Sequence, residues 1–459
     1  MQLKRLTLSV MLMGASAAVM ASGYHFGTQS VSSQSTANAS AAEAADASTI
    51  FYNAAGMTKL EGTNFSGAIN LVMPSVKYSN ASATYPTPAA FGNKNVSGVT
   101  SGTITDDLVA VPHLYVTHKL NEKVAVGLGV YVPFASSTEY ERDSVLRYNL
   151  NATSLKTIDI NPTVAFQLND QHSVAVGVIA QHAEASLRQY ANFGYALAGG
   201  NGGLPGSTAG NGAADGFADV DGEDWGFGYN LAWLWDINDA ARVGVSYRSQ
   251  IEHKLKGTAK WAKPAAGYAA LNAAGFKDVE DATVEIDTPE SLSVHGMYKL
   301  NPRVNLFGDV TWTKHSRFDK ARLVYANSKT GQGDTTYLSP AWKDTYKVAL
   351  GASYQYTDAL QLRAGVAFDK SPVPDDDHRL ATMSDNDRTW FSIGGKYDFS
   401  KQSSIDFAYS YIMIKDAKAN VDGTCTFQGV STCVSSQTKG TADYKSSAQI
   451  VGVQYNYRF

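Results

Sequence analysis

Residues 448–459, AQIVGVQYNYRF, decide the fold of this chain. Every second residue of the stretch is apolar, so that Val451, Val453, Tyr455 and Phe459 share one face and smaller or polar residues share the other. A period of two is typical of a β-strand with two unlike faces. A soluble sheet turns its apolar face into a core, whereas a membrane barrel turns that face outward toward lipid.

The same alternation recurs along the chain. Segments near 124–132, 158–168, 346–356 and 360–368 each have a continuous apolar face opposite small, polar or charged residues. Beyond the first twenty or so residues there is no run of about 18 apolar residues, which excludes α-helical membrane spans. The pattern favours a barrel with a polar lumen.

The connections between these segments alternate in length, with six short turns and seven long stretches. The short ones are 120–123, 168–171, 237–241, 300–303, 356–359 and 399–402; the long ones are roughly 79–107, 135–153, 190–220, 258–281, 326–341, 371–387 and 416–441. Such alternation is typical of outer-membrane barrels, which have short periplasmic turns and long extracellular loops. We therefore predict an all-β fold, a membrane-spanning antiparallel β-barrel of about 14 strands.

The chain divides into three parts. Residues 1–21 read as a secretory signal peptide, with Lys4 and Arg5 before an apolar run and small residues at the cleavage site. Residues 22–60 are rich in Ala and Ser and lack strand alternation, so we expect a hatch in the lumen of a barrel formed by residues 61–459. Export predicts an oxidising compartment.

Cys425 and Cys433 are the two cysteines, and we expect them to form a disulfide, with free thiols as the alternative. Two cysteines without a neighbouring histidine make half a zinc site, so no metal site is expected. A net charge of −4 argues against nucleic acid as a partner. No phosphate-binding loop occurs, and no cofactor is expected.

Four stretches together resemble the long-chain fatty acid transporter family of Gram-negative outer membranes, the FadL and TodX type. They are residues 22–60, VGLGVYVPFASSTEY at 126–140, the segment 288–319 and the segment 342–400. The resemblance covers essentially the whole mature chain. It implies a fourteen-stranded barrel with an amino-terminal hatch, located in the outer membrane, that passes long-chain fatty acids or other hydrophobic molecules without ATP.

The resemblance also implies roles for particular residues. The hatch around Phe26 and Asn53 would shift to release the ligand. Members of the family usually carry Asn-Pro-Ala in the hatch, whereas this chain has Asn53, Ala54 and Ala55 and lacks the fixed φ of proline. Many members have glycine near the position of Ala135, where an inward kink of the third strand makes a lateral opening; alanine tolerates fewer backbone conformations.

A fatty acid needs a cation for its carboxylate once the head leaves water. The strand register places Arg248, Lys347 and Arg363 on lumen faces. Each of them has an alternative role in an ion pair with a lumen acid; the candidates are Asp159, Asp309 and Asp369. In the long connection 258–281, Tyr268, Leu271 and Phe276 have spacings compatible with a short amphipathic helix, which would give an outer capture site with an apolar groove.

We expect a monomer that contacts outer-membrane lipid, lipopolysaccharide and, through Phe459, the barrel assembly machinery. Alternatives are a general porin, which has the same wall around a wide wet lumen, and an adhesin or receptor without a hydrophobic ligand. An outer-membrane hydrolase is the enzyme alternative, with His295 and His315 as isolated histidines that have no evident nucleophile. We predict that the protein is not an enzyme.

Overall fold

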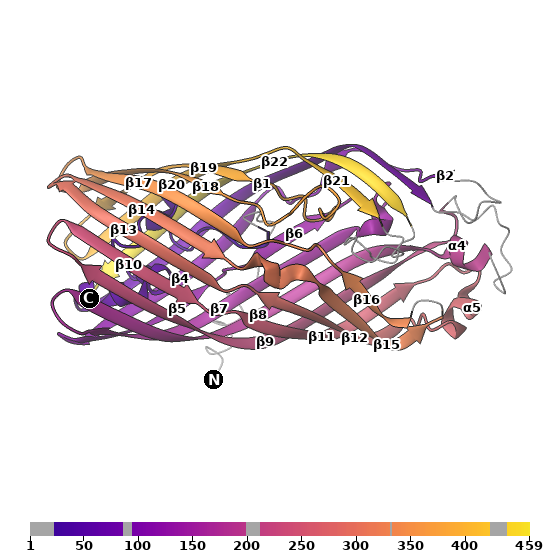
Figure 1. Ribbon diagram of the computed structural model, residues 1–459, viewed down its shortest axis with the longest axis horizontal. Helices are drawn as coiled ribbons and strands as arrows, with labels where there is room; N and C mark the ends of the chain where they lie inside the picture. Colours follow the sequence, from indigo (N-terminus) through magenta and orange to yellow (C-terminus); the bar gives the residue numbers. More distant parts are fainter. Residues whose placement is uncertain (1–22, 86–93, 199–211, 331–332, 423–437) are drawn as a thin grey trace.

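The computed structural model describes residues 23–85, 94–198, 212–330, 333–422 and 438–459. They form one closed antiparallel barrel of fourteen strands, as predicted, with the last strand paired to the first (Figure 1). In the described parts of the chain no helix has the length and apolar character needed to cross a membrane.

The extended segments alternate along the chain with short helices. The strands are β1 (Thr63–Tyr85), β2 (Lys94–Asn95), β3 (Gly102–Thr103), β4 (Val109–Asn121), β5 (Val124–Tyr131), β6 (Ala135–Glu139), β7 (Ala152–Gln167), β8 (His172–Asn192), β9 (Asp215–Asp236), β10 (Ala241–Arg248), β11 (Ile251–Ala262), β12 (Val279–Thr288), β13 (Ser291–Asn301), β14 (Val304–Thr313), β15 (Ala321–Lys329), β16 (Gly333–Leu338), β17 (Thr345–Gln355), β18 (Leu360–Asp369), β19 (Arg388–Asp398), β20 (Ser403–Ile414), β21 (Ala417–Asp422) and β22 (Lys439–Arg458). The helices are α2 (Val31–Gln34), α3 (Thr49–Tyr52), η1 (Ala54–Lys59), η3 (Arg147–Asn149), α4 (Phe193–Ala198), α5 (Tyr268–Ala273) and η5 (His315–Asp319).

Several barrel strands are interrupted once, which is why there are more segments than strands. The interrupted strands are β5 with β6, β10 with β11, β12 with β13, β14 with β15, β16 with β17, and β20 with β21.

The apolar faces point outward. In β22, Val451 is 38% and Val453 is 43% exposed, whereas Ile450 and Gln454 on the other face are fully buried. The same holds around the barrel, where Phe227, Leu350 and Ile393 are all more than half exposed. A monomeric soluble protein rarely exposes an apolar area this continuous, so the outward rows are the lipid-facing band.

The six short turns lie where predicted, but the barrel strands run further into the long connections than expected. Residues 326–341 were expected to form a loop, yet most of them continue the wall as β15 and β16. Likewise β1 runs to Tyr85 and β8 to Asn192. Beyond the membrane the outward face no longer has to be apolar, so the alternation that marks a strand in the sequence disappears there.

The segment between Gly23 and Lys59 lies inside the lumen, where it forms α2, α3 and η1. Small buried residues dominate this hatch, and glycines on the facing wall allow close approach: a Cβ at Gly365 would overlap the backbone of Thr36. Ala and Ser suit a segment that packs against a wall at short distance because their side chains are small.

Candidate functional site

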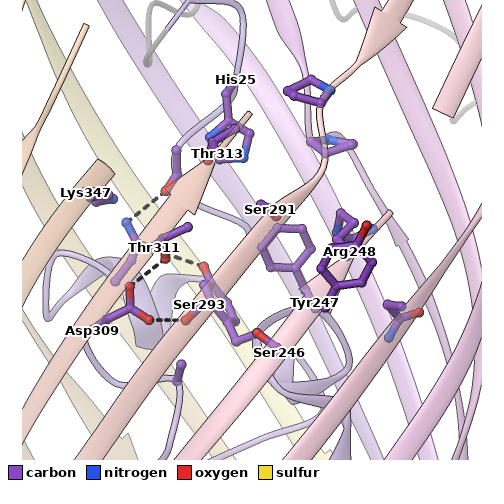
Figure 2. Close-up of a pocket in the computed structure, with 18 of the residues that line it drawn as sticks. His25, Ser246, Tyr247, Arg248, Ser291, Ser293, Asp309, Thr311, Thr313 and Lys347 are labelled. Atoms are coloured by element: carbon purple, nitrogen blue, oxygen red, sulfur yellow. Dashed lines mark hydrogen bonds between the residues drawn. The ribbon is translucent and has the colours of Figure 1, made fainter. Parts of the chain in front are cut away.

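An inner cavity lies in the lumen of the barrel, beside the hatch. It encloses about 1110 Å³ not occupied by protein atoms. Its wall comes from the hatch, from the third strand near Pro133, and from β9, β10, β13, β14 and β17 (Figure 2). The lining combines apolar rings such as Phe51 and Phe134 with charged groups, which suits an amphiphilic ligand.

The structure separates the three predicted lumen cations from one another. Arg248 lines the inner cavity, but its Nη1 pairs with Asp159 at 3.2 Å and its Nη2 donates to the Tyr131 hydroxyl at 2.9 Å. Its guanidinium also stacks on the Phe51 ring of the hatch, 4.6 Å from the centroid. The charge of Arg248 is thus neutralised by Asp159, which is the alternative role expected for it from the sequence.

Arg363 holds the hatch. It pairs with Glu43 at 3.0 Å and donates to the Ser32 carbonyl at 3.1 Å, and only 4% of it is exposed. Its acidic partner comes from the hatch and not from the wall acids considered in the sequence analysis. With its hydrogen-bonding capacity directed at the hatch, Arg363 is placed as an anchor and does not line the inner cavity.

Lys347 is the cation of the inner cavity that lacks an ion-pair partner among the described residues. Its Nζ lies 4.4 Å from the centroid of the Trp390 ring, and Asp309 and Asp369 line the same cavity. Asp309 already accepts hydrogen bonds from Ser293 at 2.6 Å and Thr311 at 2.7 Å. A ligand carboxylate could therefore bind Lys347 without breaking an existing ion pair.

A chain of hydrogen bonds joins the hatch to the wall of this cavity. The Asn53 amide donates to Nε2 of His295 at 2.8 Å, Nδ1 of His295 donates to Ser293 at 2.8 Å, and Ser293 donates to Asp309 at 2.6 Å. His295 is 2% and Asn53 1% exposed. The Ser293 and Asp309 end of the chain is visible in Figure 2. The hatch and the cavity wall are thus physically linked.

The meeting of Ser293, His295 and Asp309 does not make a catalytic triad. A triad needs the histidine between the serine and the carboxylate, so that imidazole accepts the serine proton. Here Ser293 lies in the middle and donates to the carboxylate, while Nε2 of His295 accepts from Asn53. The arrangement supplies no base for the serine.

A second, outer cavity lies further along the lumen, with about 760 Å³ of space not filled by protein atoms. Among the described residues that line it none is charged, and Leu155, Leu187, Ile286 and Leu323 are typical members. Uncharged, mostly apolar walls favour a hydrocarbon chain over a polar solute.

Tyr24 of the hatch stands between the two cavities. It lines the outer cavity, whereas the next residue, His25, lines the inner one. The Tyr24 hydroxyl donates to the Asp287 carbonyl of β12 at 2.8 Å, and its ring packs on Phe134, Phe318 and Trp342 at centroid distances of 5.4 to 5.7 Å. Tyr24 and these rings form a constriction across the lumen.

His25 of the hatch lines the inner cavity close to several basic side chains. Burial and the nearby His315, Lys347 and Arg248 lower the pKa of His25 to about 3. The imidazole is therefore neutral near pH 7. Burial is the largest cause of this shift, and the nearby cations add to it.

The third strand leaves the wall at the position where a lateral opening was predicted. β5 pairs with both β4 and β7, but β6 pairs with β7, and no pairing of β6 with β4 is found in the described strands. The freed backbone groups bond the hatch: Phe26 N–H donates to the Pro133 carbonyl at 2.7 Å, and Ala135 N–H donates to the Tyr24 carbonyl at 2.9 Å. The interruption falls on residues 132–134, just before Ala135.

The extracellular segment 258–281 contains the expected short helix, α5, which begins at Tyr268. Leu271 is 2% and Phe276 6% exposed, because both pack with Phe193 and Leu197 in a small apolar cluster; Tyr268 is 41% exposed. The cluster is closed, so a ligand would have to displace one of its side chains. Cys425 and Cys433, predicted to form a disulfide, lie outside the described residues.

Two features of the site were not predicted from the sequence. Pro133 lies in the interruption of the third strand, and a proline, which has no N–H for the ladder, was a usable signal in an otherwise alternating run. The constriction at Tyr24 had no local signal, since its partners come from four different parts of the chain.

Comparison with known proteins agrees with this architecture. The profile of the family described as outer membrane protein transport protein (OMPP1/FadL/TodX) matches residues 12–459. An outer membrane protein of Neisseria meningitidis serogroup B is 51% identical over 98% of this chain and 98% of its own length. The long-chain fatty acid transport protein of Salmonella typhi is 26% identical over 90% of this chain and 88% of its own. The crystal structure of a Pseudomonas aeruginosa FadL homologue superposes with a TM-score of 0.81 at 22% identity, covering 95% of this chain and all of that one.

Proposed function

This chain belongs to the outer membrane transport protein family that includes FadL and TodX, and from that premise we propose that it carries long-chain fatty acids inward across the outer membrane. The family transports hydrophobic compounds, and its members are passive channels and not enzymes. The finer proposal concerns the ligand and its path.

Lys347 is the observation that carries the proposal. An aromatic hydrocarbon needs no charged partner, whereas a carboxylate does. Lys347 lines the inner cavity and offers a cation without an ion pair in the described structure. The two arginines also predicted to face the lumen, Arg248 and Arg363, are already neutralised by Asp159 and Glu43.

The path runs from the outer cavity to the inner one. A ligand enters the uncharged outer cavity tail first or head first, since nothing charged lines it. Displacement of Tyr24 then opens the constriction, and the carboxylate reaches Lys347. About fifteen methylenes buried at about 0.8 kcal/mol each supply roughly 12 kcal/mol, enough to hold the ligand against its release.

Release is proposed to follow a shift of the hatch. The hydrogen-bond chain that starts at Asn53 ends at Asp309, which lines the same cavity as Lys347. A ligand carboxylate at Lys347 would therefore compete with Asp309 for the attraction of that lysine. The gap of the third strand beside Pro133 and Ala135 provides a sideways exit toward the membrane. A general porin needs a wide wet lumen, which the hatch fills here.

A binding experiment with matched ligands tests the ligand class. We expect purified protein in detergent to bind palmitate, and Lys347→Met to weaken palmitate binding about 10- to 100-fold, the loss of one charge-assisted contact of about 1.5–3 kcal/mol. Binding of 1-hexadecanol, which has the same tail without the charge, should be unchanged. Lys343→Met, at an exposed lysine, is the control.

Equal loss of palmitate and hexadecanol in Lys347→Met would remove the carboxylate role. Tighter binding of toluene than of palmitate by the unaltered protein would contradict the fatty-acid assignment itself. Uptake of labelled palmitate by cells that depend on this protein extends the test from binding to transport.

A further inference from the structure

Three lysines form a row on the outer surface of the barrel, at the end of the lipid-facing band. Lys77 of β1 and Lys445 of β22 are direct cross-strand partners, and both are exposed. Lys415 extends the row. It lies two residues after Met413 of β20, whose cross-strand partner is Ser447, and Lys445 lies two residues before Ser447 in the antiparallel β22. Lys415 and Lys445 therefore stand at about the same height. Neighbouring strands are about 4.8 Å apart, so the row spans roughly 10 Å.

The height of the row follows from the residues on either side of it. Toward the periplasm, the outward residues of the same strands include the apolar Met73, Val451 and Met413, with the polar Gln449 opposite Met73. A single pair of small residues, Ser75 and Ser447, separates Met73 from Lys77. The lysines therefore begin where the hydrocarbon band ends, at the level of lipid headgroups on the extracellular side.

Like charges placed directly opposite one another on a sheet destabilise it. Elsewhere on this rim the lysines face carboxylates: Lys156 pairs with Glu184 at 3.2 Å, Lys254 with Glu285 at 3.7 Å and Lys370 with Asp387 at 2.9 Å. Lys77 and Lys445 have no such partner among the described residues, and the nearby Asp443 is taken by Lys418 at 3.7 Å and Asn80 at 2.8 Å. Lys77 and Lys445 therefore lack a counter-anion in the described part of the chain, whereas Lys415 lies near Asp387, the residue that pairs with Lys370.

We propose that this row, Lys77, Lys445 and Lys415, is a binding site for the phosphate groups of an outer-leaflet glycolipid of the lipopolysaccharide type. The anion must stand at headgroup height, and its acyl chains must lie along the apolar residues below. A phosphorylated glycolipid of the outer leaflet supplies both. The site is independent of the transported ligand, because these side chains face away from the lumen.

The test compares two variants that remove the same charge. Lys77→Gln/Lys445→Gln removes the unpaired lysines, and Lys254→Gln/Lys260→Gln removes two exposed lysines that face Glu285 and Asp221. Each protein is titrated in mild detergent with lipid A that carries both phosphates. At about 1 kcal/mol per lysine, the first variant should bind about 30-fold more weakly and the second should bind as the unaltered protein does.

Two further arms identify what is bound. Lipid A without phosphates should bind the unaltered protein at least as weakly as bisphosphorylated lipid A binds the Lys77→Gln/Lys445→Gln variant, in which Lys415 remains. Millimolar inorganic phosphate should not displace bisphosphorylated lipid A. Equal affinities of the two variants, equal binding of dephosphorylated lipid A, or displacement by inorganic phosphate would each overturn the proposal. Heat-modifiable migration of both variants confirms that their barrels are folded.

Discussion

His295→Phe tests whether the hatch is held closed by the polar chain that starts at Asn53. The substitution removes the 2.8 Å bonds of His295 to Asn53 and to Ser293, while Asn53 keeps its bond to the Trp233 carbonyl at 3.0 Å. One buried amide hydrogen of Asn53 is left with only the long contact to the Val245 carbonyl at 3.5 Å, which costs about 1–3 kcal/mol, and the lost hydrogen bonds add about 1 kcal/mol. The substitution should therefore shift the equilibrium from the closed to the open hatch, in which water hydrates Asn53, by roughly 2–4 kcal/mol.

Hydrogen exchange measures this shift directly. At the lower figure of about 2 kcal/mol, the open population rises roughly 30-fold, and the amides of η1 should exchange faster by that factor. His113→Phe is the matched control, because His113 is also buried in the lumen but contacts Asn70 and Phe26 and not Asn53. Unchanged exchange in residues 54–59 of His295→Phe, or the same acceleration in His113→Phe, would refute the reasoning.

Other perturbations of the hatch have distinct expected outcomes. Arg363→Met leaves Glu43 buried without its cation and should lower the thermal unfolding temperature, consistent with a cost of about 3–5 kcal/mol, whereas the double variant with Glu43→Gln should recover much of it. Gly365→Val places side-chain atoms where the backbone of Thr36 lies, so limited proteolysis should cut residues 30–45 in folded barrels of the variant but not of the unaltered protein. Because His25 has a pKa of about 3 in the closed hatch and about 6.5 when released, closure should weaken by about 1.4 kcal/mol per unit as pH falls below about 6.5; exchange at residues 24–27 between pH 7.5 and 5.5 should accelerate in the unaltered protein but not in His25→Gln.

The lipid-facing half of the barrel could be predicted from the sequence because physics imposes a visible pattern there. Because hydrocarbon lies on one side of the wall and a polar lumen on the other, apolar and polar residues must alternate along each strand. The positions of the six turns and the number of strands could therefore be predicted. The outward face of the outer half contacts water and not lipid. Strands such as β15 and β16 therefore lack the alternation of apolar and polar residues, although their backbones still pair by hydrogen bonds.

The lumen residues show a different limit. The alternation correctly predicted that Arg248, Lys347 and Arg363 face the lumen, because successive side chains of a strand point to opposite faces. It could not tell an anchor from a free cation, since Glu43 lies far from Arg363 in sequence and meets it through the fold of the hatch. Long-range pairing of this kind leaves no local trace.

The position of the hatch in the chain also bears on biogenesis. The Val31 amide and the Gln34 side chain bond Gln454 and Ile450 of the final strand, at 2.9 and 3.0 Å. A ribosome completes the hatch first and that strand last. Full docking of the hatch therefore requires the last strand of the barrel, and the hatch cannot reach its final position before the chain has been synthesised almost to its end.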